Sequence, residues 1–178
     1  MALRKLLHDE IPRVPVSGIA AAPRHPITLV VDNVRSLYNV GSIFRSCDAA
    51  GVSKLVLCGF TPHPPRKEIE KTALGATASV PWEYAPDIGD ALARLKAEGN
   101  TIAALEHTDA SRSCFDLAPA LFPLVVVVGN EVSGLGERAL EYCDLAYEIP
   151  MFGVKQSLNV SVATGIMLFE CVRALTRA

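Results

Sequence analysis

The run LVVVVGNEVSGLG at residues 124–136 decides the fold class of this chain. Residues 124–129 (LVVVVG) carry apolar, mostly β-branched side chains at odd and even positions alike, which predicts a strand covered on both faces. The three glycines between residues 129 and 136 allow the backbone there to approach a ligand or another segment closely. Strands buried on both faces are typical of parallel sheets with helices on either side. The run therefore predicts an α/β fold.

Apolar strands alternate with helices in both directions from this run. Further strands are predicted at 27–32, 53–58, near 79–84, at 101–106 and at 145–150. Helices are predicted at 39–51, near 67–74, at 87–99 and from about 158 to 177. This order predicts a mainly parallel sheet with helices on both faces. Residues 1–26, which hold four prolines and show no sustained period, are expected to form an N-terminal arm, and residues 27–178 a single domain.

Composition narrows the class of protein. Half of the residues are hydrophobic and 20% are charged, which argues against disorder, and no apolar run reaches the ~20 residues that a membrane span needs. The apolar stretch near the N-terminus is too short for a secretory signal. The five scattered cysteines form no C-x-x-C pair, so they predict neither a zinc site nor a disulfide framework. We expect a cytoplasmic protein with no membrane partner, and cysteines that serve as small core residues.

The net charge of −2 hides an asymmetry between the two halves of the chain. Residues 1–80 hold ten lysines and arginines against six acidic residues, whereas residues 81–178 hold seven against thirteen. Attraction to a phosphate backbone needs a local basic patch and does not depend on the total charge. Any surface that faces a nucleic acid is therefore expected in the first half.

Ligands of parallel sheets bind beyond the carboxyl ends of the strands, so the segments that follow strands are the candidates for a site. The first such segment, residues 33–45, lacks the G-x-G-x-x-G turn of dinucleotide-binding folds. Its loop ends in Asn39, a natural N-cap, and the helix that follows holds Gly41, which permits a close approach, and Arg45. Taken alone, this segment fits an ordinary cap followed by a surface arginine.

Two more polar segments follow later strands. Glu131 lies at the mouth of the expected cleft, either as an acidic residue at a helix start or as a carboxylate that accepts from a ligand or pairs with an arginine. Residues 149–161 (IPMFGVKQSLNVS) place Ser157 and Asn159 around the start of the last helix, although one cap residue is enough. The exposed N–H groups of such a helix start also suit a carboxylate or a phosphate.

Together the three segments resemble the SpoU (TrmH-like) family of the SPOUT RNA methyltransferases. The resemblance rests on N-x-G-x-x-x-R at 39–45, V-x-G-N-E at 127–131 and I-P-M-x-G-x-x-x-S-L-N-V-S at 149–161. It covers nearly everything from residue 27 to residue 178, and three motifs in this order at strand ends are highly specific. It implies a sheet whose C-terminal part forms a deep trefoil knot, a topology so rare that periodicity alone never predicts it.

The resemblance implies transfer of a methyl group from S-adenosylmethionine to a ribose 2′-hydroxyl in structured RNA, without a metal. tRNA is favoured over rRNA, because the compact chain resembles stand-alone tRNA enzymes. The alternatives are a catalytically weak or inactive RNA-binding or assembly protein on the same fold, and a base methyltransferase of the wider SPOUT group. The intact motif residues argue against both. The resemblance also implies a homodimer formed through the knot region and the last helix.

The same resemblance implies the site residues. Because a guanidinium stays protonated in ordinary circumstances, we expect Arg45 to bind an RNA phosphate and to stabilise the developing alkoxide, with arginine-assisted deprotonation as the alternative. The rest of the catalytic set is Asn39, Glu131, Ser157 and Asn159. The cofactor contacts are expected from Leu105, Gly129, Ile149, Met151 and Leu158. Further RNA contacts are expected from Arg24, Arg35, Arg66 and Lys67, each of which is equally well explained as a solvated surface charge.

Overall fold

The computed structural model describes residues 3–12 and 23–177. Its strands are β1 (His25–Asp32), β2 (Val52–Cys58), β3 (Trp82–Ala85), β4 (Thr101–Leu105), β5 (Arg112–Ser113), β6 (Leu124–Val128) and β7 (Leu145–Glu148). Its α-helices are α1 (Leu37–Ala49), α2 (Lys67–Ala73), α3 (Ala76–Ser79), α4 (Ile88–Ala97), α5 (Glu137–Leu140) and α6 (Val160–Thr176). Short 3-10 turns occupy His8–Glu10, Cys114–Asp116 and Pro119–Leu121.

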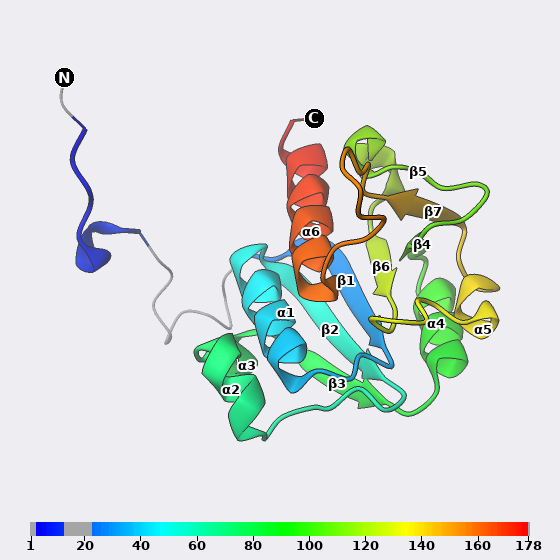
Figure 1. Cartoon of the computed structure of the whole chain (residues 1–178), viewed down its shortest axis with the longest axis horizontal. Coiled ribbons are helices and arrows are strands. Elements are labelled where there is room, and N and C mark those ends of the chain that lie inside the picture. The colour runs from blue at the N-terminus through cyan, green and yellow to red at the C-terminus, as the bar shows by residue number, and fades with distance from the viewer. Residues whose placement is uncertain (1–2, 13–22, 178) are drawn as a thin grey trace.

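The strands form one sheet in the order β3-β2-β1-β6-β4-β7-β5, in which every neighbouring pair is parallel. Helices α1 and α6 cover one face of this sheet, and α4 and α5 cover the other (Figure 1). The predicted α/β fold with helices on both faces is confirmed. None of the described helices is long and apolar enough to cross a membrane.

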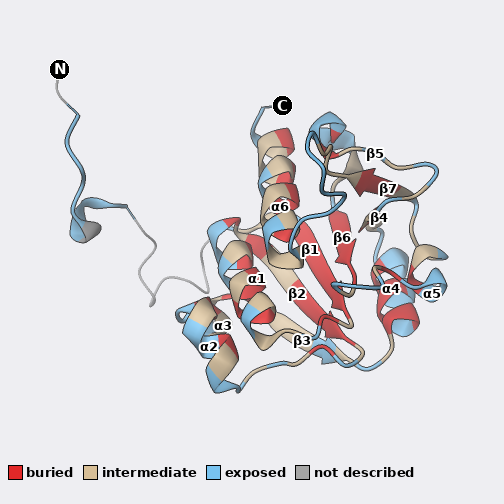
Figure 2. Ribbon diagram, in the orientation of Figure 1, coloured by how far each residue is buried: buried red, intermediate tan, exposed pale blue. Residues whose placement is uncertain are grey.

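Alternating side chains divide the sheet between two hydrophobic cores, so that β1, β2, β4 and β6 are buried along most of their length (Figure 2). Val126 belongs to the core shared with α1 and α6, whereas Val125 and Val127 belong to the core shared with α4 and α5. All five residues of β6 are buried, because both of its faces are covered and it has a partner strand at each edge. The uninterrupted apolar run is therefore explained by its central place.

Several elements differ from those predicted. β1 begins at His25, whose N–H donates to the Gly51 carbonyl (2.8 Å), so the sheet takes up the last two residues of the predicted arm. β3 is displaced to 82–85 because 76–79 form α3. β5, α3 and α5 have two to four residues each, too few for a periodic pattern to reveal. Residues 1–2 and 13–22 of the predicted arm lie outside the described residues.

The cysteines are free, and all are buried except the half-buried Cys143: Cys47, Cys58, Cys114, Cys143 and Cys171.

Helix α1 begins earlier than predicted, and its N-cap is Ser36. The Ser36 hydroxyl accepts a hydrogen bond from the Asn39 N–H (3.3 Å), so the prediction of Asn39 as the N-cap is wrong. The side chain of Asn39 is therefore available for other partners. The close approach predicted at Gly41 is confirmed, because a Cβ atom there would lie 2.3 Å from the Ile69 carbonyl oxygen of α2. Gly41 therefore lets the two helices pack directly against each other.

Candidate active site

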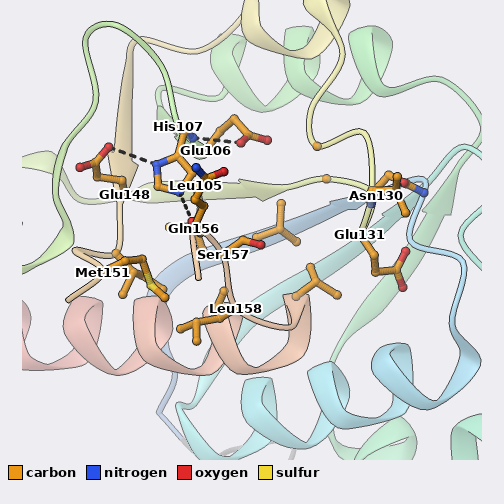
Figure 3. Close-up of a pocket in the computed structure, with 17 residues that line it drawn as sticks. Leu105, Glu106, His107, Asn130, Glu131, Glu148, Met151, Gln156, Ser157 and Leu158 are labelled. Atoms are coloured by element: carbon orange, nitrogen blue, oxygen red, sulfur yellow. Dashed lines mark hydrogen bonds and ion pairs between the residues drawn. The ribbon is translucent and has the colours of Figure 1, made fainter. Parts of the chain in front are cut away.

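A pocket lies beyond the carboxyl ends of β4, β6 and β7, the place predicted for ligands of a parallel sheet (Figure 3). Its walls come from the loop after β4, the loop after β6 and residues 149–159 between β7 and α6. The structure brings together all of the residues from which cofactor contacts were expected, since the lining includes Leu105, Gly129, Ile149, Met151 and Leu158.

The lining of this pocket divides into apolar and polar side chains. Its apolar part comes from Leu105, Val128, Ile149, Met151, Leu158 and Val160. Its polar part comes from Glu106, His107, Asn130, Glu131, Glu148, Gln156 and Ser157. S-adenosylmethionine has a flat adenine ring together with ribose hydroxyls and a charged amino-acid tail, so both kinds of lining have a matching part of the molecule. The residues present therefore fit this cofactor.

The loop after β6 is fixed from within and from β4. The Asn130 N–H donates to the Gly134 carbonyl (3.1 Å), and the Gly134 N–H donates back to the Asn130 carbonyl (3.0 Å). Glu106 accepts the Leu135 N–H (2.9 Å), which attaches the far end of the loop to the end of β4. A Cβ atom at Gly129 would lie 2.4 Å from the Gly134 carbonyl oxygen. A glycine is therefore required at position 129, because the backbone at Gly134 and Leu135 in the same loop lies too close for a side chain.

A chain of hydrogen bonds joins α1, the loop after β6 and α6. The Asn39 Nδ2 donates to the Glu131 carboxylate (2.9 Å), and the Asn159 Nδ2 donates to the Asn39 Oδ1 (3.1 Å). The Asn159 Oδ1 accepts the Ser161 N–H (2.9 Å), which makes Asn159 the N-cap of α6. A carboxylate only accepts, so Glu131 determines the orientation of both amides. Three of the five residues expected to be catalytic thus form one network, in which Asn159 donates to Asn39 and Asn39 donates to Glu131.

Ser157 and Arg45 stand apart from this network. Ser157 does not cap α6, but lines the pocket beside Leu158. Arg45 is exposed on α1 and lines a different cleft, together with Ser42, Ser46, Ala49, Lys71, Thr72 and Phe169. Within residues 3–12 and 23–177, no carboxylate pairs with Arg45. The structure therefore leaves its guanidinium accessible to a phosphate, but does not bring it into the pocket.

The carboxylate of Glu131 also binds the backbone that precedes α1. It accepts the N–H groups of Arg35 (3.0 Å) and Ser36 (3.2 Å). Partial burial tends to raise the pKa of Glu131, but the hydrogen bonds from Arg35, Asn39 and Ser36 outweigh it and hold the pKa below its ordinary value. A carboxylate with a lowered pKa is a weak base, so we assign Glu131 to positioning the network.

This assignment predicts a pH-dependent contribution of Glu131 to stability. Because its pKa is lowered on folding, its contribution is complete above the ordinary carboxyl pKa of about 4.3 and is lost as the pH falls through the lower folded value. Urea unfolding of the wild type and of Glu131→Gln should show a difference in the free energy of unfolding at pH 7 that shrinks at pH 3. The other carboxylates are common to both proteins and cancel. A difference that stays constant with pH would contradict the assignment.

The residues expected to contact RNA have different surroundings. Arg24 donates to the carbonyl oxygens of Val52 (3.1 Å) and Ser79 (2.6 Å), so its guanidinium holds the fold together and the prediction of a free RNA contact is not supported there. Arg35 follows β1, and Arg66 and Lys67 lie at the start of α2. The side chains of these three are exposed.

Five polar residues of the pocket were absent from the predicted site: Glu106, His107, Asn130, Glu148 and Gln156. The His107 Nδ1 lies 3.3 Å from the Glu148 carboxylate, and its Nε2 lies 3.0 Å from the Gln156 carbonyl oxygen (Figure 3). The imidazole thus connects the ends of β4 and β7 to the loop that precedes α6. His107 and Glu148 occur at the carboxyl ends of strands, and this position is the signal that would have found them.

We expect His107→Ala to weaken binding of S-adenosylmethionine by several-fold, because residues 149–159 lose their attachment to β4. Calorimetry with the cofactor alone measures the affinity directly. Asp109→Ala is the matched control, because Asp109 is exposed and lies outside the pocket lining. Equal affinity in wild type and His107→Ala would show that the loop keeps its place without the imidazole.

Comparisons with known proteins identify relatives of this chain. The model of the SpoU rRNA Methylase family matches residues 26–169. The 23S rRNA (guanosine-2'-O-)-methyltransferase RlmB of Vibrio parahaemolyticus is 34% identical over 160 residues, which cover 89% of this chain and 63% of that protein. RlmB of Photorhabdus laumondii is 36% identical over 148 residues, 83% of this chain and 60% of that protein. The chain spans about three-fifths of the length of these curated relatives.

Solved structures show the same architecture. The A. aeolicus TrmH/SpoU tRNA modifying enzyme has a TM-score of 0.78 at 34% identity, covering 86% of this chain and 78% of that one. The AdoMet bound rRNA methyltransferase from Sinorhizobium meliloti has a TM-score of 0.78 at 30% identity, covering 86% of this chain and 58% of that one. With all of its motif residues except Arg45 near one edge of the sheet and a family model matched over most of its length, the chain belongs to the SpoU rRNA methylase family.

Proposed function

We propose that this chain transfers a methyl group from S-adenosylmethionine to a ribose 2′-hydroxyl of structured RNA. The observation that carries the proposal is that one residue, Glu131, belongs both to the pocket lining and to the hydrogen-bond network. Glu131 accepts from Asn39, which in turn accepts from Asn159. The RlmB relatives are named guanosine-2'-O-methyltransferases, and one similar structure is named as AdoMet bound.

In this proposal the cofactor supplies an electrophilic methyl group, and the side chains of the chain position it and the RNA. The apolar part of the pocket would hold the adenine, and the polar part would hold the ribose and the amino-acid tail. Arg45 binds an RNA phosphate in its own cleft, and RNA that spans this cleft and the pocket would bring the guanidinium to the negative charge that develops on the attacking oxygen. Holding the ribose hydroxyl in place beside the cofactor would account for most of the acceleration, and the Asn39–Glu131–Asn159 network keeps the surrounding loops in place.

Ribosomal RNA is the substrate class that the comparisons favour. The RlmB relatives are named for 23S rRNA, whereas the preference for tRNA was based on the compactness of the chain. One observation keeps tRNA as a second candidate, since the similar A. aeolicus structure is named as a tRNA modifying enzyme. The two substrate classes are therefore separate arms of the test.

We further propose the trefoil knot and the homodimer, both implied by the family resemblance, and a cytoplasmic location. The sheet order β1-β6-β4-β7 and the attachment of residues 149–159 to both α1 and β4 support the knot. The half-exposed apolar side chains of Val162 and Phe169 on α6 support a partner surface. Light scattering that shows a monomer at micromolar concentration with full activity would reject the dimer.

The proposed function is tested by mass spectrometry of nucleosides from purified rRNA and tRNA, isolated from cells with and without this protein. We expect one methylated nucleoside to disappear without the protein, with the extra mass on the ribose fragment. Incubation of the deficient RNA with purified protein and labelled S-adenosylmethionine should restore it. A label on the nucleobase fragment would overturn the 2′-O assignment. No label, despite cofactor binding in calorimetry, would favour the RNA-binding or assembly alternative.

A further inference from the structure

The loop between β2 and α2, residues 59–66 (GFTPHPPR), is anchored at several points. Thr61 is 2% exposed, and its hydroxyl donates to a backbone carbonyl of β1 (3.2 Å). The Tyr84 hydroxyl of β3 donates to the Gly59 carbonyl (2.8 Å), and its ring lies 4.9 Å from that of His63. A loop with these anchors has a fixed backbone.

Phe60 is the exception in this loop, because its side chain is 62% exposed. The backbone that carries it is fixed, since the Phe60 N–H donates to the Asn33 Oδ1 (3.0 Å). Gly59, directly before it, has a φ of +62°, and a Cβ there would lie 2.1 Å from the same oxygen. The loop therefore presents an aromatic ring to solvent from a rigid base. Such a ring loses little conformational freedom when a ligand stacks on it.

Asn33 connects Phe60 to the candidate active site. Its side chain accepts from the Phe60 N–H, and its carbonyl accepts from the Asn130 Nδ2 (2.7 Å). Asn130 directly precedes Glu131, which anchors the Asn39–Glu131–Asn159 network. The loop after β2 and the start of α1 also lie together at the lower edge of the sheet in Figure 1. The ring is therefore held at a fixed place beside the proposed reaction site.

Exposed basic residues occur on the segments that follow β2 and β1. Arg66 ends the loop that carries Phe60, Lys67 begins α2, and Arg35 follows β1. Within the part of the chain that the structure describes, none of these cations pairs with a carboxylate. A second half-exposed aromatic side chain, Tyr38, stands in the first turn of α1. Cations among exposed aromatic rings are typical of surfaces that bind single-stranded nucleic acid.

We propose that Phe60 stacks on an unpaired base of the RNA substrate near the methylated ribose, while Arg66 and Lys67 bind its phosphates. The inference rests on the proposed function and deepens it, because it names the state of the RNA that the site accepts. A base within a regular RNA helix is stacked on both faces and offers none to the ring. The substrate nucleotide, or its neighbour, must therefore lie in a loop, a bulge or an open strand.

The proposal is tested with a short fluorescent RNA composed only of A and C, which forms no Watson–Crick pairs, and with the duplex of the same strand. Anisotropy measures binding to each. Phe60→Ala should weaken binding of the single strand by about tenfold. Phe60→Leu should weaken it equally, because leucine keeps the apolar area and lacks the π face, whereas Phe60→Trp should retain it. Phe115→Ala is the matched control: Phe115 is 49% exposed, and its carbonyl accepts from Arg173 of α6, away from this edge.

A spectroscopic signal separates stacking from a structural role. In Phe60→Trp, the added indole should be quenched by the single-stranded RNA beyond the change in Trp82, the one native tryptophan. Equal binding by the wild type and by the leucine variant, or an unquenched indole, would overturn the proposal. If ribose methylation is found but does not depend on the aromatic ring at residue 60, only this inference fails. If the A and C strand shows ring-dependent binding but rRNA and tRNA from the deficient cells receive no methyl group, only the proposed function fails.

Discussion

Arg45→Ala is expected to lower the single-turnover rate of methyl transfer by about 100-fold or more, the effect of removing one group that stabilises transition-state charge. Affinity for S-adenosylmethionine should stay within a few-fold, because Arg45 is outside the pocket lining. Single-turnover kinetics at saturating RNA, with calorimetry of the cofactor, measure both quantities.

Two matched variants define what Arg45 does. Lys71→Ala removes a charge from the same cleft, so it should raise the RNA concentration needed for half-maximal rate and leave the rate at saturation within a few-fold. Arg45→Lys keeps the charge but loses the planar fork of donors, and should recover only part of the rate. A rate like that of the wild type in Arg45→Ala would remove this residue from the catalytic set.

Gly129→Ala is expected to weaken binding of S-adenosylmethionine by at least about tenfold, equivalent to about 1.4 kcal/mol. The added Cβ would lie 2.4 Å from the Gly134 carbonyl oxygen and 2.6 Å from the Leu135 nitrogen, so the backbone of the loop must move. That movement disturbs the Asn130–Gly134 pairing and the bond from Leu135 to Glu106, and with them one wall of the pocket. Overpacking of this kind costs about 1–3 kcal/mol of stability as well.

Gly136→Ala is the matched control for this substitution. Gly136 ends the same loop with a φ of −74°, and a Cβ there would have no atom within 4 Å. The cofactor affinity and the melting temperature of the Gly136→Ala protein should therefore match those of the wild type. If a folded Gly129→Ala protein bound the cofactor as tightly as the control, the loop after β6 would not be part of the cofactor site.

Much of the fold was predictable from local pattern. The apolar runs of β1, β2, β4 and β6 are unambiguous because each is buried on both faces by helices. The pattern failed at β5 and α5, whose two and four residues are stabilised by contacts with distant segments and have no period of their own. Ser36 as the N-cap of α1 was missed because Asn39 is an equally good cap in sequence. Ser36 is the cap in the structure because the Asn39 side chain instead donates to the Glu131 carboxylate.

The candidate site was predictable at the level of residue types. Asn39, Glu131 and Asn159 were placed in one set by motif, and the structure joins them by hydrogen bonds. The direction of those bonds was not readable, because an amide alone donates and accepts equally well, and only the neighbouring carboxylate orients it. The opposite case is Arg24, whose charge predicted an RNA contact and whose guanidinium instead binds two backbone carbonyls.

The sequence by itself determined the α/β class, the strands of the centre of the sheet and the edge at which a site forms. These features follow from burial, and burial is recorded locally as runs of apolar side chains with polar residues where the strands end. Only the tertiary structure decided that Gly129 serves its own loop, that Arg45 stands in a separate cleft, and that His107 attaches the loop before α6. Each of these depends on which segments distant in the chain lie within a few ångströms of one another, and no local period encodes that distance.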